Sequence, residues 1–526
     1  MLLTMDMGTS NTRLFLCEGD RVVATARAPF GAKLSKTESK DRLYARLGEL
    51  ISSLLVGEGI APEDVECIMT SGMAGSEMGI AEIPHAPLPA DVYTLADGLT
   101  ALSVPKITPI PFVLVPGLAA MRGGRITDMM RGEETETAGI LSALPEARDC
   151  LLVLPGTHNK LISIDGEGRI TDFLTTMSGE LLDGVVRGSV LSGSVSHDFT
   201  PSEAEVLLGA RYAEEKSLSA ALFHIRVMAK NGKDTAALSS FLYGAVLGGD
   251  IAPIRRMAAG RRILIGGRES LSRIYALLLG EDAEPLDSTL TAEATRRGLC
   301  ELYALKKARE KRAEVLAAVE REKLIAIVRL PEEETLLPAM EALYAGGVRL
   351  AEITFDRSGK VPREETAGRI AALRAHFGDR MHVGAGTVTS VDEVMLAYRA
   401  GAEFIISPTC QPEIIRMTRR LGLVSIPAAM TPTEVVLAMD SGADFVKLFP
   451  ADSLDPGFIK AVSAPIADAK FLAVGGVTAD NVGEFLSRGF VGVGVGSGIY
   501  AKGLIESGDY AGLTALAERY TRALKQ

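Results

Sequence analysis

The residue with the clearest chemical potential is Lys447, in the middle of the apolar, β-prone run Phe445–Pro450. Burying a lone ammonium group is costly, so a lysine in such a run tends to lower its pKa and become a neutral amine. A neutral amine attacks carbonyl carbons and forms Schiff bases. The alternative is a lysine near a strand end whose ammonium group reaches water.

Other polar residues in the same half of the chain fall at the ends of short apolar runs. Arg329 closes the first run, Glu352 lies in the second and Thr387 ends the third. Glycine-rich turns follow the last two runs, at Gly475–Val477 and Gly494–Ser497. A Schiff-base lysine, a proton-moving carboxylate, a cation for a carboxylate and backbone N–H groups for a phosphate together predict an aldolase acting on a phosphorylated keto acid.

Each of these residues also has an ordinary structural interpretation when taken alone. Glu352 could be a salt-bridged strand residue, and Arg329 could be a surface cation. The Gly475-Gly476 pair could serve only the geometry of a tight turn. The joint occurrence of all these groups with Lys447 favours the catalytic interpretation.

The elements that must position these residues form a regular series. Eight strand–helix units in about 200 residues predict a compact (β/α)8 barrel, a TIM barrel, with its catalytic residues at the C-terminal strand ends. The eight expected strands are residues 324–328, 350–355, 382–388, 404–408, 424–427, 445–450, 471–477 and 491–497.

In the first half of the chain, three glycine turns follow apolar strands. Asp6 precedes the turn Gly8-Thr9-Ser10-Asn11, and later strands lead into Gly156-Thr157 and Gly266-Gly267. Backbone N–H groups, hydroxyls and a strand-end carboxylate suit nucleotide phosphates and Mg²⁺. An ordinary polar hairpin is the alternative for the first turn. The three turns in this order favour a nucleotide site.

The chain is too long for one core, and its composition excludes some partners. It has 526 residues, 47% hydrophobic and 23% charged, with a net charge of −11. Such a charge argues against nucleic acid or an anionic membrane as partner, and we expect no membrane span. The five cysteines show no CxxC spacing, which favours reduced thiols and a cytoplasmic location.

A charged, helix-forming stretch without Gly or Pro, residues 303–322, separates the two halves. We therefore expect one domain at 1–308, a helical linker at 309–318 and a second domain at 319–526.

Residues 1 to about 300 resemble the 2-dehydro-3-deoxygalactonokinases of the acetate-kinase/Hsp70/actin (ASKHA) superfamily. The resemblance implies an α/β, two-lobed, actin/hexokinase-like kinase that uses ATP and Mg²⁺ to phosphorylate the 6-hydroxyl of a 2-keto-3-deoxy sugar acid. The stretches that carry it are Asp6–Arg13, Thr70–Ser76, Val115–Leu118, Met130–Thr135, Leu154–Lys160 and Thr176–Leu181.

The resemblance also implies roles for the residues in these stretches. Asp6 would organise Mg²⁺, and Gly266 and Gly267 would lie near adenosine. The general base stays open, since Glu133 and Glu134 could be solvated helix-start carboxylates, and His158 could be a phosphate donor or a turn residue. The residues expected to meet the ATP phosphates are Gly8, Thr9, Ser10, Asn11, Gly156 and Thr157, and those expected to hold the sugar acid are Ser71, Arg131 and Glu133.

The second half resembles the class I 2-dehydro-3-deoxy-6-phosphogluconate and 6-phosphogalactonate aldolases along its whole length. The stretches that carry this resemblance are Ile325–Arg329, Glu352–Thr354, Val383–Val388, Ile405–Pro408, Pro427–Glu434, Val446–Pro450 and Gly475–Val477.

This resemblance implies Lys447 as the Schiff-base nucleophile and Glu352 as general acid and base through water. It implies Arg329 and Thr387 on the pyruvyl carboxylate, no metal or other cofactor, and a homotrimer held by the barrels. The other residues expected to bind substrate are Pro408, Gly475, Gly476, Gly496 and Ser497.

The sequence departs from the gluconate-type members at one position. Four residues after the glutamate, where an arginine is expected, it has Asp356, followed by Arg357. This tilts specificity toward the galactonate epimer. Either Arg357 substitutes for the missing arginine, or Arg329 alone holds the carboxylate.

The two halves fit one reaction sequence, because the product of the kinase is the substrate of the aldolase. We expect a bifunctional enzyme that acts on small sugar acids. Three alternatives stay open: the same reactions on the gluconate epimer, an aldolase fused to a non-catalytic ATP and sugar-acid sensor, and an aldolase of broader aldehyde range.

Overall fold

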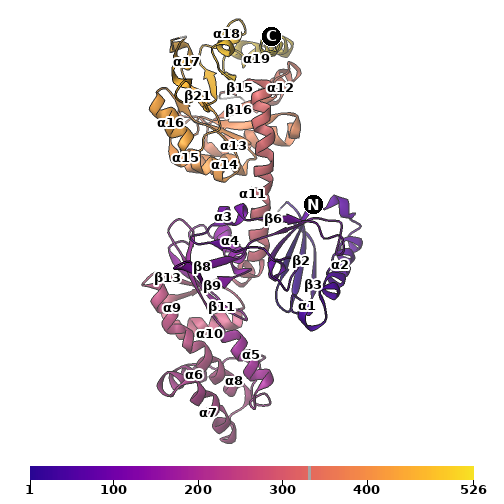
Figure 1. Ribbon diagram of the computed structural model, residues 1–526, viewed down its shortest axis with the longest axis vertical. Coiled ribbons are helices and arrows are strands. Elements are labelled where there is room, and N and C mark those ends of the chain that lie inside the picture. The colour runs from indigo at the N-terminus through magenta and orange to yellow at the C-terminus, as the bar shows by residue number, and fades with distance from the viewer. Residues whose placement is uncertain (20, 330–332, 456, 526) are drawn as a thin grey trace. The chain divides into compact units, whose positions relative to one another are not determined.

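The computed structural model describes residues 1–19, 21–329, 333–455 and 457–525 (Figure 1). The chain divides into two compact units, Met1–Ala304 and Leu305–Gln526. The boundary falls inside the long helix α11 (Ser288–Glu322), which also contains the expected linker at 309–318.

The first unit is built on two sheets that repeat one topology. The first sheet has the order β3-β2-β1-β4-β7-β6 and the second the order β12-β11-β10-β13-β14. In each, an antiparallel three-strand meander is followed by two strands in parallel pairing. This confirms the predicted two-lobed α/β architecture.

The strands of these sheets begin and end as follows: β1 (Leu2–Met7), β2 (Thr12–Glu18), β3 (Arg21–Ala28), β4 (Cys67–Gly72), β6 (Thr100–Leu102), β7 (Phe112–Leu114), β10 (Cys150–Leu154), β11 (Asn159–Ile164), β12 (Ile170–Thr176), β13 (Arg262–Ile265) and β14 (Ala283–Pro285). A third, small sheet has the order β5-β8-β9 and consists of β5 (Ala86–Pro87), β8 (Leu118–Arg122) and β9 (Arg125–Met130).

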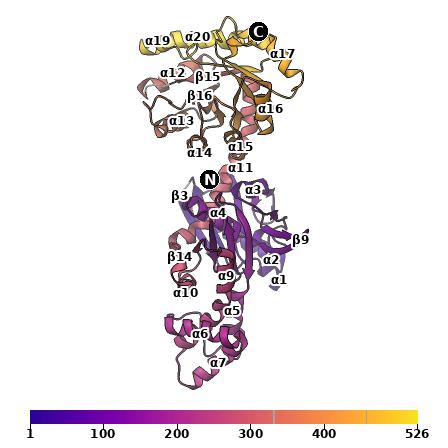
Figure 2. The same ribbon diagram turned by 90° about the vertical axis from the view of Figure 1, so that its left-hand side faces the viewer.

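Helices cover both large sheets and enclose two separate apolar cores, one beneath each sheet. Helices α6 and α7 lie side by side at the end of the second lobe (Figures 1 and 2). The helices of this unit are α1 (Leu34–Thr37), α2 (Lys40–Gly57), α3 (Val92–Asp97), α4 (Glu133–Ala143), α5 (Ser178–Gly188), α6 (Glu203–Lys216), α7 (Leu218–Lys230), α8 (Thr235–Leu247), α9 (Ile251–Ala258) and α10 (Glu269–Leu279), with 3₁₀ turns η1 (Pro62–Asp64), η2 (Met73–Gly75), η3 (Gly248–Asp250) and η4 (Gly280–Asp282).

One helical run, Thr235–Ala258, is long and apolar enough to cross a membrane by length and composition alone. Within the unit, 67% of its apolar window is buried. Its side chains, including Phe241 and Leu242, belong to the core of the second lobe. The run is therefore explained as a core element.

The second unit is a closed barrel of parallel strands. Its sheet order is β19-β18-β17-β16-β15-β23-β22-β21-β20. The two ends of this order, β19 (Val424–Ile426) and β20 (Ala428–Ala429), are separated in sequence only by Pro427. They form one interrupted fifth strand, so the ladder begins and ends at the same place. This confirms the predicted eight-unit barrel.

The outer helices surround these strands, as α13–α16 do around β15, β16 and β21 in Figure 1. The other strands are β15 (Leu324–Val328), β16 (Leu350–Thr354), β17 (His382–Gly386), β18 (Phe404–Ile406), β21 (Val446–Leu448), β22 (Phe471–Val474) and β23 (Gly492–Val495). The helices are α12 (Glu333–Ala345), α13 (Arg363–Phe377), α14 (Val391–Arg399), α15 (Pro412–Arg420), α16 (Pro432–Asp440), α17 (Phe458–Ser463), α18 (Val482–Ser487), α19 (Lys502–Glu506) and α20 (Tyr510–Ala523), with η5 (Gly378–Arg380) and η6 (Ala451–Ser453).

The end of α11 belongs to the core of this barrel. Val315, Ala318 and Val319 pack against strand residues such as Phe404 and Phe445. Residue Arg312, also on α11, forms an ion pair with Asp444, just before β21. The segment before the first strand is thus an integral part of the second unit.

We predict that Val319→Ala lowers the free energy of unfolding of the barrel by about 2 kcal/mol, because it removes buried methyl groups and leaves a cavity. Val319 is only 1% exposed. Loss of aldolase activity with increasing urea would report the effect. Val436→Ala, at a residue 44% exposed on α16, is the matched control. Equal shifts of the two midpoints would contradict this account of α11.

Candidate active sites

Lys447 and Glu352 lie on the inner face of the barrel. Lys447, on β21, is 7% exposed, and Glu352, on β16, is 2% exposed. Burial lowers the pKa of Lys447, and the charge of Arg329 lowers it further while Glu352 opposes the shift. Burial raises the pKa of Glu352 to about 7, against the opposing charges of Lys447 and Arg329. Burial therefore makes the neutral amine of Lys447 easier to reach than that of an exposed lysine, and the same barrel interior holds a carboxyl group that can both donate and accept a proton near neutral pH.

Glu352 has one oxygen ready for a reacting group or a water. Among the described residues, its buried Oε2 atom has no hydrogen-bond partner. The Lys447 Nζ atom lies 5.1 Å from the centre of the Phe449 ring. Leaving a buried carboxylate oxygen unpaired is unfavourable, which is typical of a group kept for function.

Gly386, the last residue of β17, makes the room that Glu352 occupies. A Cβ atom at this position would lie 1.8 Å from the Glu352 Oε1 atom. The next residue, Thr387, adopts a left-handed φ of 57°. Such a conformation is uncommon outside glycine and often marks a functional site.

Arg357, the residue after Asp356, is held within the loop after β16. Its Nη2 atom lies 2.5 Å from Glu393 Oε2 and 2.5 Å from the carbonyl oxygen of Thr387. Asp356 accepts hydrogen bonds from the backbone N–H groups of Ser358, Lys360 and Val361, which lower its pKa. Both residues hold the loop after β16. Arg329, at the end of β15, is exposed and influences both Glu352 and Lys447 electrostatically.

The glycine turns predicted to hold phosphate lie at the ends of β22 and β23. Gly475 and Gly476 have positive φ values of 102° and 69°. At the end of β23, the Gly496 carbonyl accepts the N–H groups of Ile499 and Tyr500, and Ser497 is exposed. Pro408 is half-buried just after β18. The structure therefore places Glu352 and Lys447 within β16 and β21, and the other residues predicted for this half at or just after the C-terminal ends of the barrel strands.

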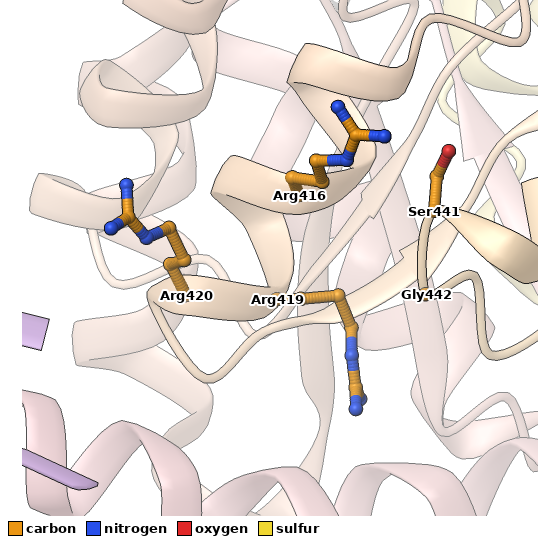
Figure 3. Close-up of a pocket in the computed structure, with 5 residues that line it drawn as sticks. All are labelled: Arg416, Arg419, Arg420, Ser441 and Gly442. Carbon is orange, nitrogen blue, oxygen red and sulfur yellow. The ribbon is translucent and has the colours of Figure 1, made fainter. Parts of the chain in front are cut away.

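A hollow of about 420 Å³ elsewhere on the barrel is not this site. It is lined by Arg416, Arg419 and Arg420 at the end of α15 and by Ser441 and Gly442 after α16. These segments precede β19 and β21, so the hollow lies at the N-terminal side of the strands. Figure 3 shows its three guanidinium groups pointing in different directions. It offers no convergent donors to a single ligand.

In the first unit, two predicted phosphate loops have the same construction. Each follows the first strand of a meander and reads Gly-Thr-x-Asn, at 8–11 and 156–159. Each is supported from below by a glycine: a Cβ atom on Gly31 would lie 2.2 Å from the Gly8 carbonyl oxygen, and one on Gly179 would lie 2.0 Å from that of Gly156. The duplication of the sheets thus extends to the loops.

The third predicted turn meets the second loop. The Gly266 N–H donates to the carbonyl oxygen of Val153 at 2.9 Å, at the end of β10. A Cβ atom on Gly267, whose φ is 79°, would lie 2.9 Å from the carbonyl oxygen of Pro155. His158 is turned toward α5, where its Nε2 atom lies 2.8 Å from Glu180 Oε2.

Asp6 and Ser71 are neighbours across the β1–β4 ladder and have different partners. The Asp6 Oδ2 atom accepts hydrogen bonds from Arg13 at 2.6 and 3.1 Å. Ser71 is buried, and its hydroxyl donates to Thr135 Oγ1 at 2.8 Å. Thr135 in turn donates to Glu134 Oε1 at 3.0 Å. Ser71 therefore joins β4 to the start of α4.

Two groups at the start of α4 are buried without a partner among the described residues: Arg131 Nη1 and Glu133 Oε2. The other Arg131 nitrogen, Nη2, donates to the carbonyl of Ile83 at 2.9 Å. Burial raises the pKa of Glu133, while the charge of Lys160 and backbone N–H groups oppose the shift. A cation and a carboxylate with unused polar atoms suit a sugar-acid ligand.

The carboxylates beside Glu133 are also held away from water. Burial and the charge of Glu133 raise the pKa of Glu134 to about 7. Burial and the charges of Glu133 and Asp6 raise the pKa of Glu136 to about 8. Hydrogen bonds connect this region to both large sheets: Ser71 of β4 donates to Thr135 of α4, and Lys160 of β11 donates to the carbonyl oxygen of Met129, shortly before α4.

Sequence reasoning missed Asp250, a buried residue that accepts hydrogen bonds from four side chains near the second loop. The available signal was a charged residue, preceded by Gly248-Gly249, in the long apolar run 235–258.

Comparisons with known proteins agree with this geometry. A family model described as 2-keto-3-deoxy-galactonokinase matches residues 6–302, and one described as KDPG and KHG aldolase matches residues 315–516. A 2-dehydro-3-deoxy-phosphogluconate aldolase of Treponema pallidum is 32% identical over 206 residues, which cover 39% of this chain and 95% of the relative. The 2-dehydro-3-deoxy-6-phosphogalactonate aldolase of Escherichia coli is 33% identical over 181 residues, which cover 34% of this chain and 85% of the relative.

Among solved structures, a Sinorhizobium meliloti protein assigned as a 2-dehydro-3-deoxygalactonokinase is 26% identical with a TM-score of 0.48, covering 57% of this chain and 98% of its own.

Fold and sites therefore define a bifunctional enzyme with a kinase unit and a Schiff-base aldolase unit. The chain belongs to the 2-keto-3-deoxy-galactonokinase family over residues 6–302 and to the KDPG and KHG aldolase family over residues 315–516.

We predict that Gly386→Ala abolishes aldolase activity, because the added methyl group would displace the Glu352 carboxyl group from its position. Phosphorylation by the first unit should be unchanged. Pyruvate release and ADP release, measured separately, check both statements. Gly368→Ala, on α13, is the control because a Cβ atom there meets no atom within 4 Å. Retention of full aldolase activity in Gly386→Ala would show that Glu352 need not occupy this place.

We also predict a pH effect on stability from Glu352. Its pKa rises from an ordinary value of 4.5 to about 7 on folding. Between these values the folded state binds more protons than the unfolded state, so stability falls as pH rises through this window. Glu352→Gln removes this titration. When the pH is raised from 5 to 8, the free energy of unfolding of wild type should therefore fall relative to that of the variant by on the order of 3 kcal/mol.

Urea unfolding followed by circular dichroism at both pH values measures this change. Exposed Glu364 provides the control variant, Glu364→Gln, for which the difference from wild type should stay constant with pH. A constant difference for Glu352→Gln as well would mean that the Glu352 carboxyl group titrates normally.

Proposed function

We propose that this chain phosphorylates 2-dehydro-3-deoxy-D-galactonate at its 6-hydroxyl with Mg-ATP and then cleaves the 6-phosphate to pyruvate and D-glyceraldehyde 3-phosphate. The observation that carries the second reaction is the buried pair of Lys447 and Glu352 in the barrel. The first reaction is supported by the two duplicated Gly-Thr-x-Asn loops and by the family of residues 6–302.

In the aldolase unit, the neutral amine of Lys447 attacks the C2 carbonyl of the substrate, and loss of water gives the Schiff base. Glu352, through a water, takes the proton of the C4 hydroxyl as the C3–C4 bond breaks and D-glyceraldehyde 3-phosphate leaves. The same carboxyl group returns a proton to C3 of the remaining enamine. Water then hydrolyses the Schiff base, which releases pyruvate and restores the amine. No metal or other cofactor takes part.

The substrate is held by the remaining residues at the strand ends. Arg329 and Thr387 bind the pyruvyl carboxylate, and Pro408 contacts the substrate beside them. The backbone N–H groups of the turns after β22 and β23 would receive the phosphate, and the turn after β22 contains the two positive-φ glycines Gly475 and Gly476. The phosphate ligands in this proposal are Gly475, Gly476, Gly496 and Ser497.

In the kinase unit, Asp6 would hold Mg²⁺ through water, beside the loop that begins at Gly8. Bound Mg²⁺ and ATP supply the phosphoryl group and neutralise its charge. Their fit to this site is supported by the partly exposed Asp6 carboxylate and by the two glycine-supported loops. The residues that would meet ATP are Gly8, Thr9, Ser10, Asn11, Gly156, Thr157, Gly266 and Gly267.

The sugar acid would bind at the start of α4. The unpaired Nη1 atom of Arg131 suits its carboxylate, and the unpaired Oε2 atom of Glu133 suits a hydroxyl group. Ser71, which donates to Thr135, forms the floor of this subsite.

Preference for the galactonate epimer is supported by the loop after β16. Asp356 stands where gluconate-type members are expected to have an arginine, and it accepts backbone N–H groups of its own loop. Arg357 is held by Glu393. Arg329 is thus the cation left to bind the substrate carboxylate, together with Thr387.

We further propose that residues 1–308 carry the kinase and residues 319–526 the aldolase, with the α11 residues 309–318 as a helical connection that packs on the barrel. We also propose that the aldolase barrels form a homotrimer and that the protein is cytoplasmic. Sedimentation of the purified chain tests the trimer. A monomer at micromolar concentration would overturn that part of the proposal.

We predict that the whole chain, given Mg-ATP and 2-dehydro-3-deoxy-D-galactonate, releases ADP and pyruvate in equal amounts. Lys447→Ala should keep ADP release and lose pyruvate, because it removes the nucleophile. Asp6→Ala should lose ADP release from the sugar acid but keep cleavage of added 6-phosphate. Lys460→Ala and Asp41→Ala, at exposed positions, are the matched controls.

The alternatives give different results in the same assay. Faster ADP release with the gluconate epimer would reverse the substrate preference. Pyruvate from the 6-phosphate without any ADP from the sugar acid would make the first unit a sensor. Pyruvate from unphosphorylated substrate at the same rate would mean an aldolase of broader range. Pyruvate release by Lys447→Ala would refute the Schiff-base mechanism.

A further inference from the structure

Asp250 is a buried carboxylate in an unusual place. It ends the turn η3 and stands directly before α9, where an aspartate side chain commonly caps the helix. Its side chain makes no such cap, and the residue is only 4% exposed. In the part of the chain that the structure describes, Asp250 takes part in no ion pair. Its charge is therefore balanced by hydrogen bonds alone.

Four side chains donate to this carboxylate, each from a different element. Ser178 Oγ donates to Oδ1 at 2.9 Å, from the start of α5. Oδ2 accepts from Thr176 Oγ1 at 3.2 Å, from Asn159 Nδ2 at 3.1 Å and from Tyr275 OH at 2.5 Å. Burial and the charge of Asp250 raise the pKa of Tyr275, so this phenol keeps its proton and remains a donor. Asp250 thus joins β11, β12, α5 and α10.

One of these donors leads directly to the second Gly-Thr loop. The Asn159 amide group donates through Nδ2 to Asp250 and, at 2.6 Å, to Tyr275 OH. Both N–H bonds of the Asn159 amide point toward Asp250 and Tyr275, so the Oδ1 atom faces the other way. There it accepts a hydrogen bond from the Gly156 N–H at 3.0 Å. The carboxylate of Asp250 therefore fixes which way the Asn159 amide points and, through it, the start of the loop.

A second donor supports the same loop from below. Ser178, bound to Asp250 Oδ1, begins helix α5. The next residue, Gly179, lies against the Gly156 carbonyl, and the N–H of Glu180 donates to the Thr157 carbonyl oxygen at 2.8 Å. Asp250 thus holds the loop on two sides.

The first loop is fixed differently. There the Gly8 N–H donates to the main-chain carbonyl of Asn11 at 2.8 Å, and the nearby carboxylate of Asp6 pairs with Arg13. In the second lobe the position two residues before the glycine is Leu154, which has no charge. The second loop is instead held in place by Asp250, which lies 94 positions after Gly156 in the sequence.

We propose that Asp250 is a positioning residue for ATP: through Asn159 and the start of α5, it holds the Gly156-Thr157 loop in the conformation that receives the phosphates. This inference rests on the proposed kinase function of the first unit. It assigns Asp250 and Asn159 to nucleotide binding by way of the loop, and neither residue to the acceptor sugar acid.

The test compares three single variants and one double variant of the full chain. Asp250→Asn replaces one accepting oxygen by an NH2 group, which would face the hydrogen-bond donors that now bind the carboxylate. Asn159→Ala removes the link to Gly156. Ser239→Ala is the matched control, since it deletes a buried hydrogen bond of the same lobe, from the Ser196 N–H, and leaves the partners of Asp250 in place. KM for ATP, KM for the sugar acid, calorimetric ADP affinity and the thermal midpoint are measured for each.

We expect Asp250→Asn and Asn159→Ala each to raise KM for ATP and weaken ADP binding by about tenfold or more, the loss typical when a residue that orients a ligand-holding group is removed. KM for the sugar acid should stay unchanged. The double variant should resemble the single variants, because both substitutions act through one loop. Ser239→Ala should lower the thermal midpoint and leave the ATP constants unchanged.

A structural role for Asp250 alone would give another pattern: a lower thermal midpoint with normal KM for ATP and normal ADP affinity. That result, or additive effects in the double variant, would overturn the proposal. If Asp250→Asn fails to fold, Asn159→Ala decides by itself, and unchanged ADP affinity in that variant refutes the link. Wild-type protein that binds ADP but transfers no phosphate would contradict the proposed function, while the ADP affinities would still decide the role of Asp250.

Discussion

The aldolase unit depends on the removal of one acid and one amine from water. A buried ammonium and a buried carboxylate are each unfavourable, and each neutral form becomes easier to reach as water is excluded. Glu352 and Lys447 belong to different strands of the same barrel, and both side chains are buried. The barrel therefore does more than hold two residues in place. By excluding solvent it raises the pKa of Glu352 and lowers the pKa of Lys447.

The kinase unit solves a different problem, which is to present backbone groups to highly charged phosphates. Backbone N–H groups are available only where a loop is left out of the sheet ladders, and such loops need support. Gly31 and Gly179 let chain segments approach the two loops closely enough to give that support. The duplicated meanders supply the same Gly-Thr-x-Asn sequence twice, and the start of α4 adds carboxyl groups whose pKa values are raised. Order in this unit comes from close backbone contact, whereas order in the barrel comes from apolar burial.

Much of this arrangement could be predicted from the sequence because its signals are local. Each barrel strand is a short apolar run, and Lys447 and Glu352 stand out as charged residues inside such runs. The contacts that position the catalytic groups are not local. Arg357 meets Glu393 across 36 residues, and Asn159 meets Asp250 across 91. Nothing in the composition around Asp250 indicates its four donors, and nothing around Gly386 indicates the carboxyl group that it accommodates. Such relations appear only when strands distant in sequence become neighbours.

The interruption at Pro427 has a consequence for how the active lysine is aligned. The part of the fifth strand before this residue is paired with β18, and the part after it is paired with β21. The N–H of Lys447 itself donates to the Pro427 carbonyl oxygen at 2.8 Å, and this bond sets Lys447 opposite Ala428. Side chains alternate along a strand, so a slip by one residue would bring Val446 or Leu448 inward in place of the lysine. Such a register shift would leave a folded barrel without the lysine in its interior, and therefore without aldolase activity. The fidelity of catalysis in this unit therefore begins with the register of one short strand.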